Sequence, residues 1–273
     1  MRLINQKVSR PAGFLLAAIP FAIVIIAYVS ASGARLAVNP SDKLLPSFAS
    51  MAEAFWRMAT QPDRRSGSLL LWADTAASLA RLALGIGISA LLALLLGVPI
   101  GLIPKIRGLL NAFIATFSLI PPITVLPILF IAVGLGEASK IALIIIGTAP
   151  VMTRAIALAV SELPVELLVK AQTLGASTWQ IILRVVLPQI WPKLVVAIRL
   201  GLVPAWIFLI SAEAIASTEG LGYRIFLVRR YLAMDVILPY VAWITLIAFL
   251  LDRALMLSSR RFFRWAHLGG GGL

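Results

Sequence analysis

Residues 162–188, ELPVELLVKAQTLGASTWQIILRVVLP, form the longest amphipathic segment in a chain that is otherwise close to continuously apolar. Leucine, isoleucine and valine alternate here with charged and amide side chains in a rhythm that is typical of helices. Gly175 interrupts the rhythm, and the Ser177 to Gln180 spacing is that of a capping box, which starts a new helix. The segment therefore predicts helix, glycine turn and second helix, with Leu187-Pro188 ending the second helix.

This hairpin lies between two long apolar segments of the sequence. A polar-faced helical hairpin between two membrane spans is a docking surface for a soluble partner. The alternative is a hairpin that lies on the lipid headgroups, and periodicity alone does not separate the two interpretations.

The composition is that of a membrane protein. Of the 273 residues, 61% are hydrophobic and only 13% are charged, and the mean hydropathy is +1.01. The formal net charge of +13 comes from basic residues scattered between apolar segments. In a membrane protein such residues orient loops and meet anionic headgroups, so we expect no nucleic-acid partner. The chain has no cysteine, which excludes disulfides and a thiol nucleophile.

The apolar runs predict an all-α protein with about six transmembrane helices. The expected crossings are residues 11–34, 82–104, 108–136, 138–159, 193–214 and 236–257, and a short interfacial helix is expected over residues 47–60. The third crossing should break at Pro121-Pro122, because consecutive prolines remove two backbone donors. Such a break must be buried in the bundle or line a cavity. Gly97 and Gly101 form a small-residue pair that allows close helix contact.

The distribution of basic residues favours cytoplasmic termini. An even number of crossings puts both termini on one side, and placing them inside puts the hairpin and most cations in the cytoplasm. The loop from Arg35 to Trp72 is then outside. The rule is not unanimous, since Arg64, Arg65, Arg229 and Arg230 would also lie outside.

Motifs for chemistry are sparse. No G-x-x-x-x-G-K-[ST] loop is present, and the sole histidine is His267 near the C-terminus, so metal, ATP-binding or histidine-based catalysis is not expected in this chain. Transport remains, either as a subunit driven by a separate ATPase or as a stand-alone secondary transporter or channel. The second class should show ionisable groups or broken helices at corresponding positions of two sequence halves, and no internal repeat is seen. A membrane-embedded scaffold explains neither the hairpin nor the Pro-Pro break.

The hairpin resembles the "EAA" loop of binding-protein-dependent ABC importer permeases. The loop pattern of these permeases is E-A-A, three residues, G, nine residues and I-x-L-P. This chain matches the spacing, the glycine at Gly175 and the end at Leu187-Pro188. The three opening positions are Val169, Lys170 and Ala171, so the glutamate of the pattern is absent. Further motifs, in order over residues 72–257, resemble the nitrate/sulfonate/taurine/bicarbonate branch: Ser78-Leu-Ala-Arg81 with Gly85, Gly97-Val-Pro-Ile-Gly101, Pro121-Pro122 with Pro127, Gly134-Leu-Gly136-Glu137 and Glu219-Gly-Leu-Gly222.

The resemblance implies a type I importer permease in the bacterial cytoplasmic (inner) membrane. Its partners would be a second permease copy, two ATP-binding cassette subunits that bind the ATP and Mg, and an extracytoplasmic binding protein; no cofactor is expected in this chain. The solute would be nitrate, a sulfonate or taurine, bicarbonate or a small nitrogenous compound. Residues 1–70 would form an N-terminal span and outer loop, residues 71–258 the permease domain with the coupling hairpin at 162–188, and residues 259–273 a cytoplasmic tail.

Two sets of site residues follow. The expected ATPase-coupling residues are Glu162, Glu166, Lys170, Ala171, Leu174, Gly175, Ala176, Ser177 and Trp179. The expected translocation path is lined by Pro121, Pro122, Thr124, Trp206, Ser211 and Glu213. Alternatives stay open for single residues: Glu213 as an acid at headgroup level, Arg81 as a structural interface residue, and the Thr124 and Ser211 hydroxyls bonded to their own backbone.

Overall fold

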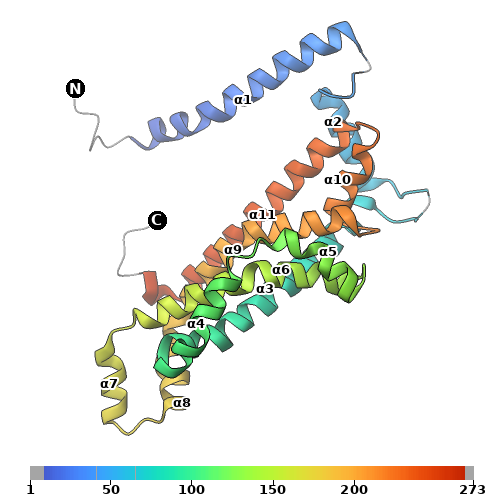
Figure 1. Ribbon diagram of the computed structural model, residues 1–273. Helices are drawn as coiled ribbons and strands as arrows, with labels where there is room; N and C mark the ends of the chain where they lie inside the picture. The colour runs from blue at the N-terminus through green and yellow to red at the C-terminus, as the bar shows by residue number, and fades with distance from the viewer. Residues whose placement is uncertain (1–8, 41, 65, 268–273) are drawn as a thin grey trace.

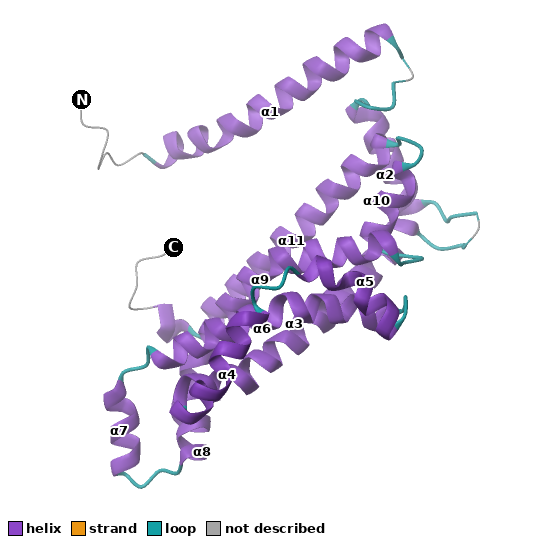
Figure 2. Cartoon of the chain, in the orientation of Figure 1, coloured by secondary structure: helices purple, strands orange, loops and turns teal. Residues whose placement is uncertain are grey.

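The computed structural model describes residues 9–40, 42–64 and 66–267, and these residues form helices and loops without a strand (Figure 2). The long helices are α1 (Arg10–Val38), α3 (Leu70–Leu102), α6 (Glu137–Ser161), α9 (Leu187–Ile215) and α11 (Met234–Phe262). The shorter elements are α2 (Phe48–Thr60), α4 (Pro104–Phe117), α5 (Pro122–Val133), α7 (Val165–Thr173), α8 (Thr178–Ile181), the π-helical turn η1 (Ile182–Val186), α10 (Leu221–Arg229) and the terminal 3₁₀ turn η2 (Arg264–His267).

The number of membrane crossings agrees with the sequence. Five helical stretches of the described chain are long and apolar enough to span a bilayer, and the bent pair α4 and α5 makes a sixth if it counts as one span. The short helix expected over residues 47–60 is α2. The prediction of an all-α membrane protein with about six crossings is confirmed.

Helices α3, α6 and α9 form the centre of the bundle, and α11 packs alongside (Figure 1). The predicted small-residue pair lies on the face of α3 that meets α6. A Cβ atom on Gly97 would lie 2.8 Å from the carbonyl oxygen of Thr153, and one on Gly101 would lie 2.6 Å from that of Ala157. Only glycine lets the two backbones approach this closely, so the Gly97 and Gly101 prediction is confirmed.

Helix α1 leaves the bundle as a separate apolar rod (Figure 1). The apolar window that qualifies it as a span buries none of its residues within the chain. Its contacts are with the loop that follows it and with α2. The Tyr28 hydroxyl donates to the carbonyl of Pro46 at 2.7 Å, the Ser32 hydroxyl donates to that of Leu45 at 2.9 Å, and the Tyr28 ring packs against Phe48 of α2. A helix that is apolar on all sides needs lipid or another protein around it, which fits a membrane span.

Pro188 does not end a helix, contrary to the sequence prediction. The chain runs from α8 through η1 into α9, and Pro188 lies in the first turn of α9. The π-helical turn gives the physical reason, because the Leu187 N–H bonds to the carbonyl of Ile182, five residues back. The wider turn accommodates the proline ring and its missing donor, so α9 begins at Leu187, before the start expected for the fifth crossing at residue 193.

Candidate functional site

The hairpin of residues 162–188 projects beyond the end of the bundle (Figure 1). Helix α7 has no buried residue. Gly175 has φ +79°, which is the left-handed conformation that glycine adopts without strain. The capping box is complete: the Gln180 N–H donates to the Ser177 hydroxyl at 3.3 Å, and the Ser177 N–H donates to Oε1 of Gln180 at 2.8 Å. The predicted turn and second helix start are confirmed.

The tip of the hairpin carries exposed apolar side chains, and its base is anchored. Leu174 is 87% exposed and Trp179 is 67% exposed. At the base, Ile181 and Val186 are buried in a cluster that includes Val160 of α6. A soluble partner could therefore bind the tip, and a displacement of the tip would reach α6 and α9 through a packed base.

The break in the third crossing lies at residues 118–121, between α4 and α5. The two helices meet at 93°, and Pro122 sits in the first turn of α5. Ser118 and Pro122 line a cavity of about 310 Å³ between this joint, α6 and α9. The break therefore lines a cavity, as the sequence predicts for unpaired backbone in a membrane.

The residues predicted for the translocation path fall in separate places. Pro121 and Thr124 are exposed at the joint, and the Thr124 hydroxyl donates to the carbonyl of Pro121 at 2.7 Å. Ser211 lies on α9 and donates to the carbonyl of Ile207 at 2.7 Å. Trp206 is buried, and its indole N–H has no partner among the described residues. Both hydroxyls thus bond their own backbone, and the path assignment stays a prediction.

Glu213 is fully buried near the C-terminal end of α9, the end far from the hairpin. Its carboxylate accepts hydrogen bonds from the Ser78 hydroxyl at 2.8 Å, from Nη1 of Arg81 at 2.7 Å and from the N–H of Gly222 at 2.9 Å. The interpretation of Glu213 as an acid at headgroup level is therefore wrong. The sequence did not show this, because two of the three donors, Ser78 and Arg81, lie 135 and 132 positions away on α3.

Arg81 is the cation of this network. Its Nε donates to Glu137 at 2.5 Å, and its Nη1 donates to the carbonyl of Glu219 at 2.9 Å as well as to Glu213. Lys140, which is also buried, donates to Glu137 at 2.7 Å. Arg81 thus joins α3 to the start of α6, to the end of α9 and to the following loop, which confirms its interpretation as a structural interface residue.

Asp74 extends the network to two further helices. It accepts from Nε of Arg224 at 2.8 Å, from the hydroxyl of Tyr240 at 3.2 Å and from the N–H of Gly220 at 3.0 Å. Burial alone would lower the pKa of Arg224, but the hydrogen bond and the charge of Asp74 leave that pKa above its usual value. The network therefore fixes the loop before α10 and joins α3 to α10 and α11.

The sequence contained one signal for this network. Asp74, Ser78 and Arg81 are four and three residues apart, which places them on one face of a helix. A polar stripe on a helix that is otherwise apolar predicts buried polar contacts. Such a stripe does not identify the residues that it contacts, which lie up to 166 positions away in the sequence.

A multi-pass helical bundle, with a bent crossing that lines a cavity and an exposed hairpin anchored to its central helices, defines a transport permease subunit. The chain belongs to the family of binding-protein-dependent transport system inner membrane components, whose family model matches residues 66–265.

Named relatives agree with this. The chain is 39% identical over 196 residues to the taurine transport system permease protein TauC of Escherichia coli (strain K12), covering 71% of each chain. It is 28% identical to the bicarbonate transport system permease protein CmpB of Synechococcus elongatus, over 67% of this chain and 66% of that one. The fold matches a bacterial ABC transporter involved in the import of the acidic polysaccharide alginate with a TM-score of 0.64, covering 91% of this chain and 96% of that one at 15% identity.

The protein is therefore a transmembrane subunit of an ABC importer of the bacterial inner membrane. It is a permease and not an enzyme, and ATP hydrolysis belongs to a separate subunit. Importers of this kind work with an ATPase and a binding protein, so both are partners of this chain.

Proposed function

We propose that two copies of this chain form the translocation pathway for a small polar or anionic solute. The candidates are taurine or another sulfonate, nitrate, bicarbonate and a small nitrogenous compound, and the names of the relatives for taurine and bicarbonate support the anionic members of this set. Two ATP-binding cassette subunits bind the ATP and Mg, and an extracytoplasmic binding protein delivers the solute.

The hairpin is the element that couples ATP hydrolysis to transport. The observation that carries this assignment is its exposure: α7 buries no residue, while the second helix continues into α9 without a break. The contact surface comprises Glu162, Glu166, Lys170, Ala171, Leu174, Gly175, Ala176, Ser177 and Trp179. With Val169 at the position of the family's glutamate, apolar contacts from Leu174 and Trp179 contribute more of the binding than an acidic side chain does.

Movement of the hairpin acts on the pathway through α6 and α9. The base of the hairpin packs on α6, and the far end of α9 is tied to α3 and α6 by Glu213 and Arg81. Because exposing a buried carboxylate costs several kcal/mol, these helices move as one unit. The bent pair α4 and α5 is less tightly held, since each of these helices has a single buried residue. When α3, α6 and α9 rock together against the α4–α5 pair, the cavities open to the other side of the membrane.

The test is a substitution at the turn. Gly175→Val places a β-branched residue at φ +79°, which costs about 1–2 kcal/mol and distorts the turn. We expect assembly with the ATPase subunits to weaken about tenfold and solute-stimulated ATPase activity to fall accordingly. Gly175→Asn should retain most of the activity, because asparagine tolerates this conformation.

Gly108→Val is the matched control, because a Cβ atom at Gly108 meets nothing within 4 Å and its φ is not positive. If Gly175→Val assembles and responds to solute as the control does, the hairpin is not the coupling element.

A further inference from the structure

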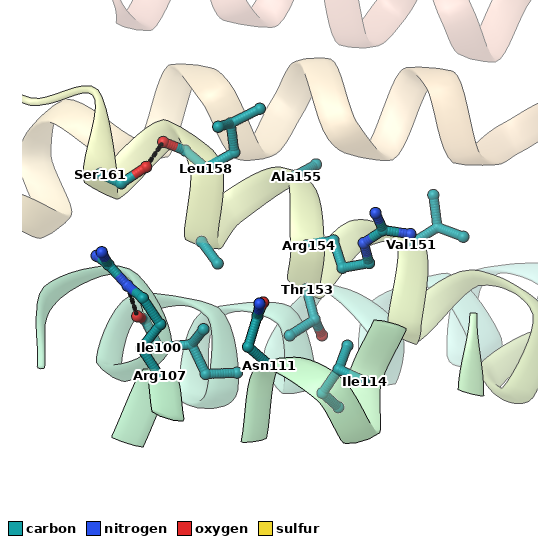
Figure 3. A pocket seen from close by; sticks show the side chains of 11 residues that line it. Ile100, Arg107, Asn111, Ile114, Val151, Thr153, Arg154, Ala155, Leu158 and Ser161 are labelled. Atoms are coloured by element: carbon teal, nitrogen blue, oxygen red, sulfur yellow. Dashed lines mark hydrogen bonds between the residues drawn. The ribbon is translucent and has the colours of Figure 1, made fainter. Parts of the chain in front are cut away.

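A cavity of about 430 Å³ lies between α4 and α6 on the side of the bundle from which the hairpin projects (Figure 3). Arg107, Asn111 and Ile114 line it from α4, and α6 lines it from Val151 to Ser161, with Arg154 among these residues. Arg107 and Arg154 lie at opposite ends, and Asn111 points into the space between the helices (Figure 3). The cavity therefore offers hydrogen-bond donors along its length.

The lining carries positive charge without a counter-charge. It contains two arginines and no carboxylate. Neither arginine forms an ion pair with a described acidic residue. Arginine within a membrane-spanning bundle pairs with an acid or faces a water-filled cavity, because burying it unpaired is costly. Arg81 on α3 and Arg199 on α9 follow the first option. Arg154 has no acidic partner among the described residues, and its exposed side chain lines the cavity instead.

Arg154 also occupies a junction between two cavities. The cavity at the α4–α5 joint shares Val151 and Ala155 with this one, so the two are neighbours along one face of α6. Nη1 of Arg154 donates to the Ser118 hydroxyl at 2.9 Å, and Ser118 lines the cavity at the joint. In addition to the packing of α4 and α5 on α6, this hydrogen bond links the joint to α6 where the two cavities meet.

The two arginines are not equally free to bind a ligand. Arg107 donates through Nε and Nη2 to the carbonyls of Ile100 and Gly101, which are unpaired at the end of α3. Arg154 uses one donor of its five on a neutral hydroxyl, which an anion replaces readily. The amide of Asn111 has no hydrogen-bond partner among the described residues, and it supplies a second donor.

We propose that this cavity binds a small oxyanion in transit, and that Arg154 is the residue that binds it, exchanging the Ser118 hydroxyl for an anionic oxygen. This rests on the proposed function and narrows its solute to the anionic candidates, which are sulfonates, nitrate and bicarbonate. The exchange breaks the hydrogen bond between the α4–α5 joint and α6 at the point where the two cavities meet, so the anion itself loosens the wall between them. A lipid phosphate offers the same chemistry, and the experiment distinguishes the two sources.

The experiment measures charge selectivity at a single cysteine. The native chain has no cysteine, so Ala155→Cys, on the shared wall of the two cavities, gives the only thiol. The complex with its ATPase subunits, in a maltoside detergent, is treated with anionic and cationic methanethiosulfonates, and each rate is divided by that of a free thiol. We expect the normalised rate of the anionic reagent to exceed that of the cationic reagent. Arg154→Gln should lower the ratio of the anionic to the cationic rate about tenfold, which is the effect of one nearby charge at intermediate dielectric.

Two variants control for charge and for folding. Arg261→Gln removes the same charge from an exposed position outside the cavity and should leave the ratio unchanged. Arg154→Lys keeps the charge and should keep the preference, even if Arg154→Gln folds poorly. An anionic preference that persists in a folded Arg154→Gln complex overturns the proposal.

Competition identifies the source of the anion. Millimolar inorganic sulfate, the probe for the free oxyanion, should slow the anionic reagent at Ala155→Cys when Arg154 is present, and should not slow it when Arg154→Gln is added to the same variant. Protection by added phosphatidylglycerol without protection by sulfate means a lipid site, which overturns the transit assignment. Labelling does not depend on ATP hydrolysis. The labelling result can therefore support the anion site even if the Gly175→Val test contradicts the coupling role of the hairpin, and the coupling role can hold even if the labelling result contradicts the anion site.

Discussion

At the scale of single residues, the hydrogen-bond network of Asp74, Arg81 and Glu213 places charged side chains where they are almost fully buried. Asp74 and Glu213 are fully buried and Arg81 is 3% exposed. A carboxylate withdrawn from water costs several kcal/mol unless its oxygens are bonded. Here Oε1 of Glu213 accepts from Arg81, Oε2 accepts from the N–H of Gly222, and the two oxygens share the Ser78 hydroxyl. The network therefore stabilises the bundle only as long as each partner is present.

The pair Glu213 and Glu219 gives a matched test of this argument, because both carboxylates approach Arg81 and differ in burial. Glu213→Gln replaces an acceptor facing Arg81 by an amide and should destabilise the chain by about 3 kcal/mol. Glu219→Gln should change stability by less than about 1 kcal/mol, since Glu219 is 57% exposed and lies 3.7 Å from the guanidinium. Thermal unfolding of both variants in detergent measures the difference. Equal melting temperatures would show that burial does not determine the strength of this network.

At the scale of helices, the seam between α3 and α6 depends on missing side chains. Gly101→Ala would push a methyl group against the carbonyl of Ala157 and the Cβ of Val160, so we expect a loss of about 1–3 kcal/mol in stability. Gly87→Ala in the same helix meets nothing within 4 Å and should be neutral or stabilising by up to about 1 kcal/mol, through the higher helix propensity of alanine. Thermal unfolding again measures both. A Gly101→Ala variant as stable as Gly87→Ala would mean that α6 can shift away from α3.

Some features of the helices could be predicted from the sequence and others could not. Long uncharged runs predict the spans well, since a bilayer requires about 20 apolar residues whatever the neighbours are. The continuity of α8, η1 and α9 was not predictable from Leu187-Pro188, because a proline ends an α-helix but fits after a π-helical turn. The turn at Gly175 and the capping box were predictable, because both depend on bonds within a few residues.

At the scale of the whole molecule, functional positions depend on contacts that no local pattern contains. Asp74 and Tyr240 bond across 166 positions, and Arg154 and Ser118 across 36. The sequence could identify such residues only as polar groups in apolar runs. Only the arrangement of α4 against α6 shows that the Arg154 side chain faces a cavity.

The orientation of the whole chain is the property on which the coupling proposal depends. Six crossings with cytoplasmic termini place the hairpin where an ATPase can reach it and the α2–α3 loop outside. Single cysteines at Ser66, Ser177 and Ser258 report on this, because all three side chains are exposed, whereas the neighbouring Ser259 is buried. A membrane-impermeant thiol reagent added to spheroplasts should modify position 66 only, and positions 177 and 258 should react after the cells are lysed.

Each labelling pattern has a definite meaning. Modification at 177 in intact spheroplasts would put the hairpin outside and exclude its contact with an ATPase. Modification at 258 but not at 177 would mean an odd number of crossings between them, which the continuous helix from α8 to α9 followed by α11 does not allow. Protection at both positions leaves the anchored hairpin on the cytoplasmic side, where ATP-driven closure can pull on α9 and, through Glu213 and Arg81, on the far end of the bundle.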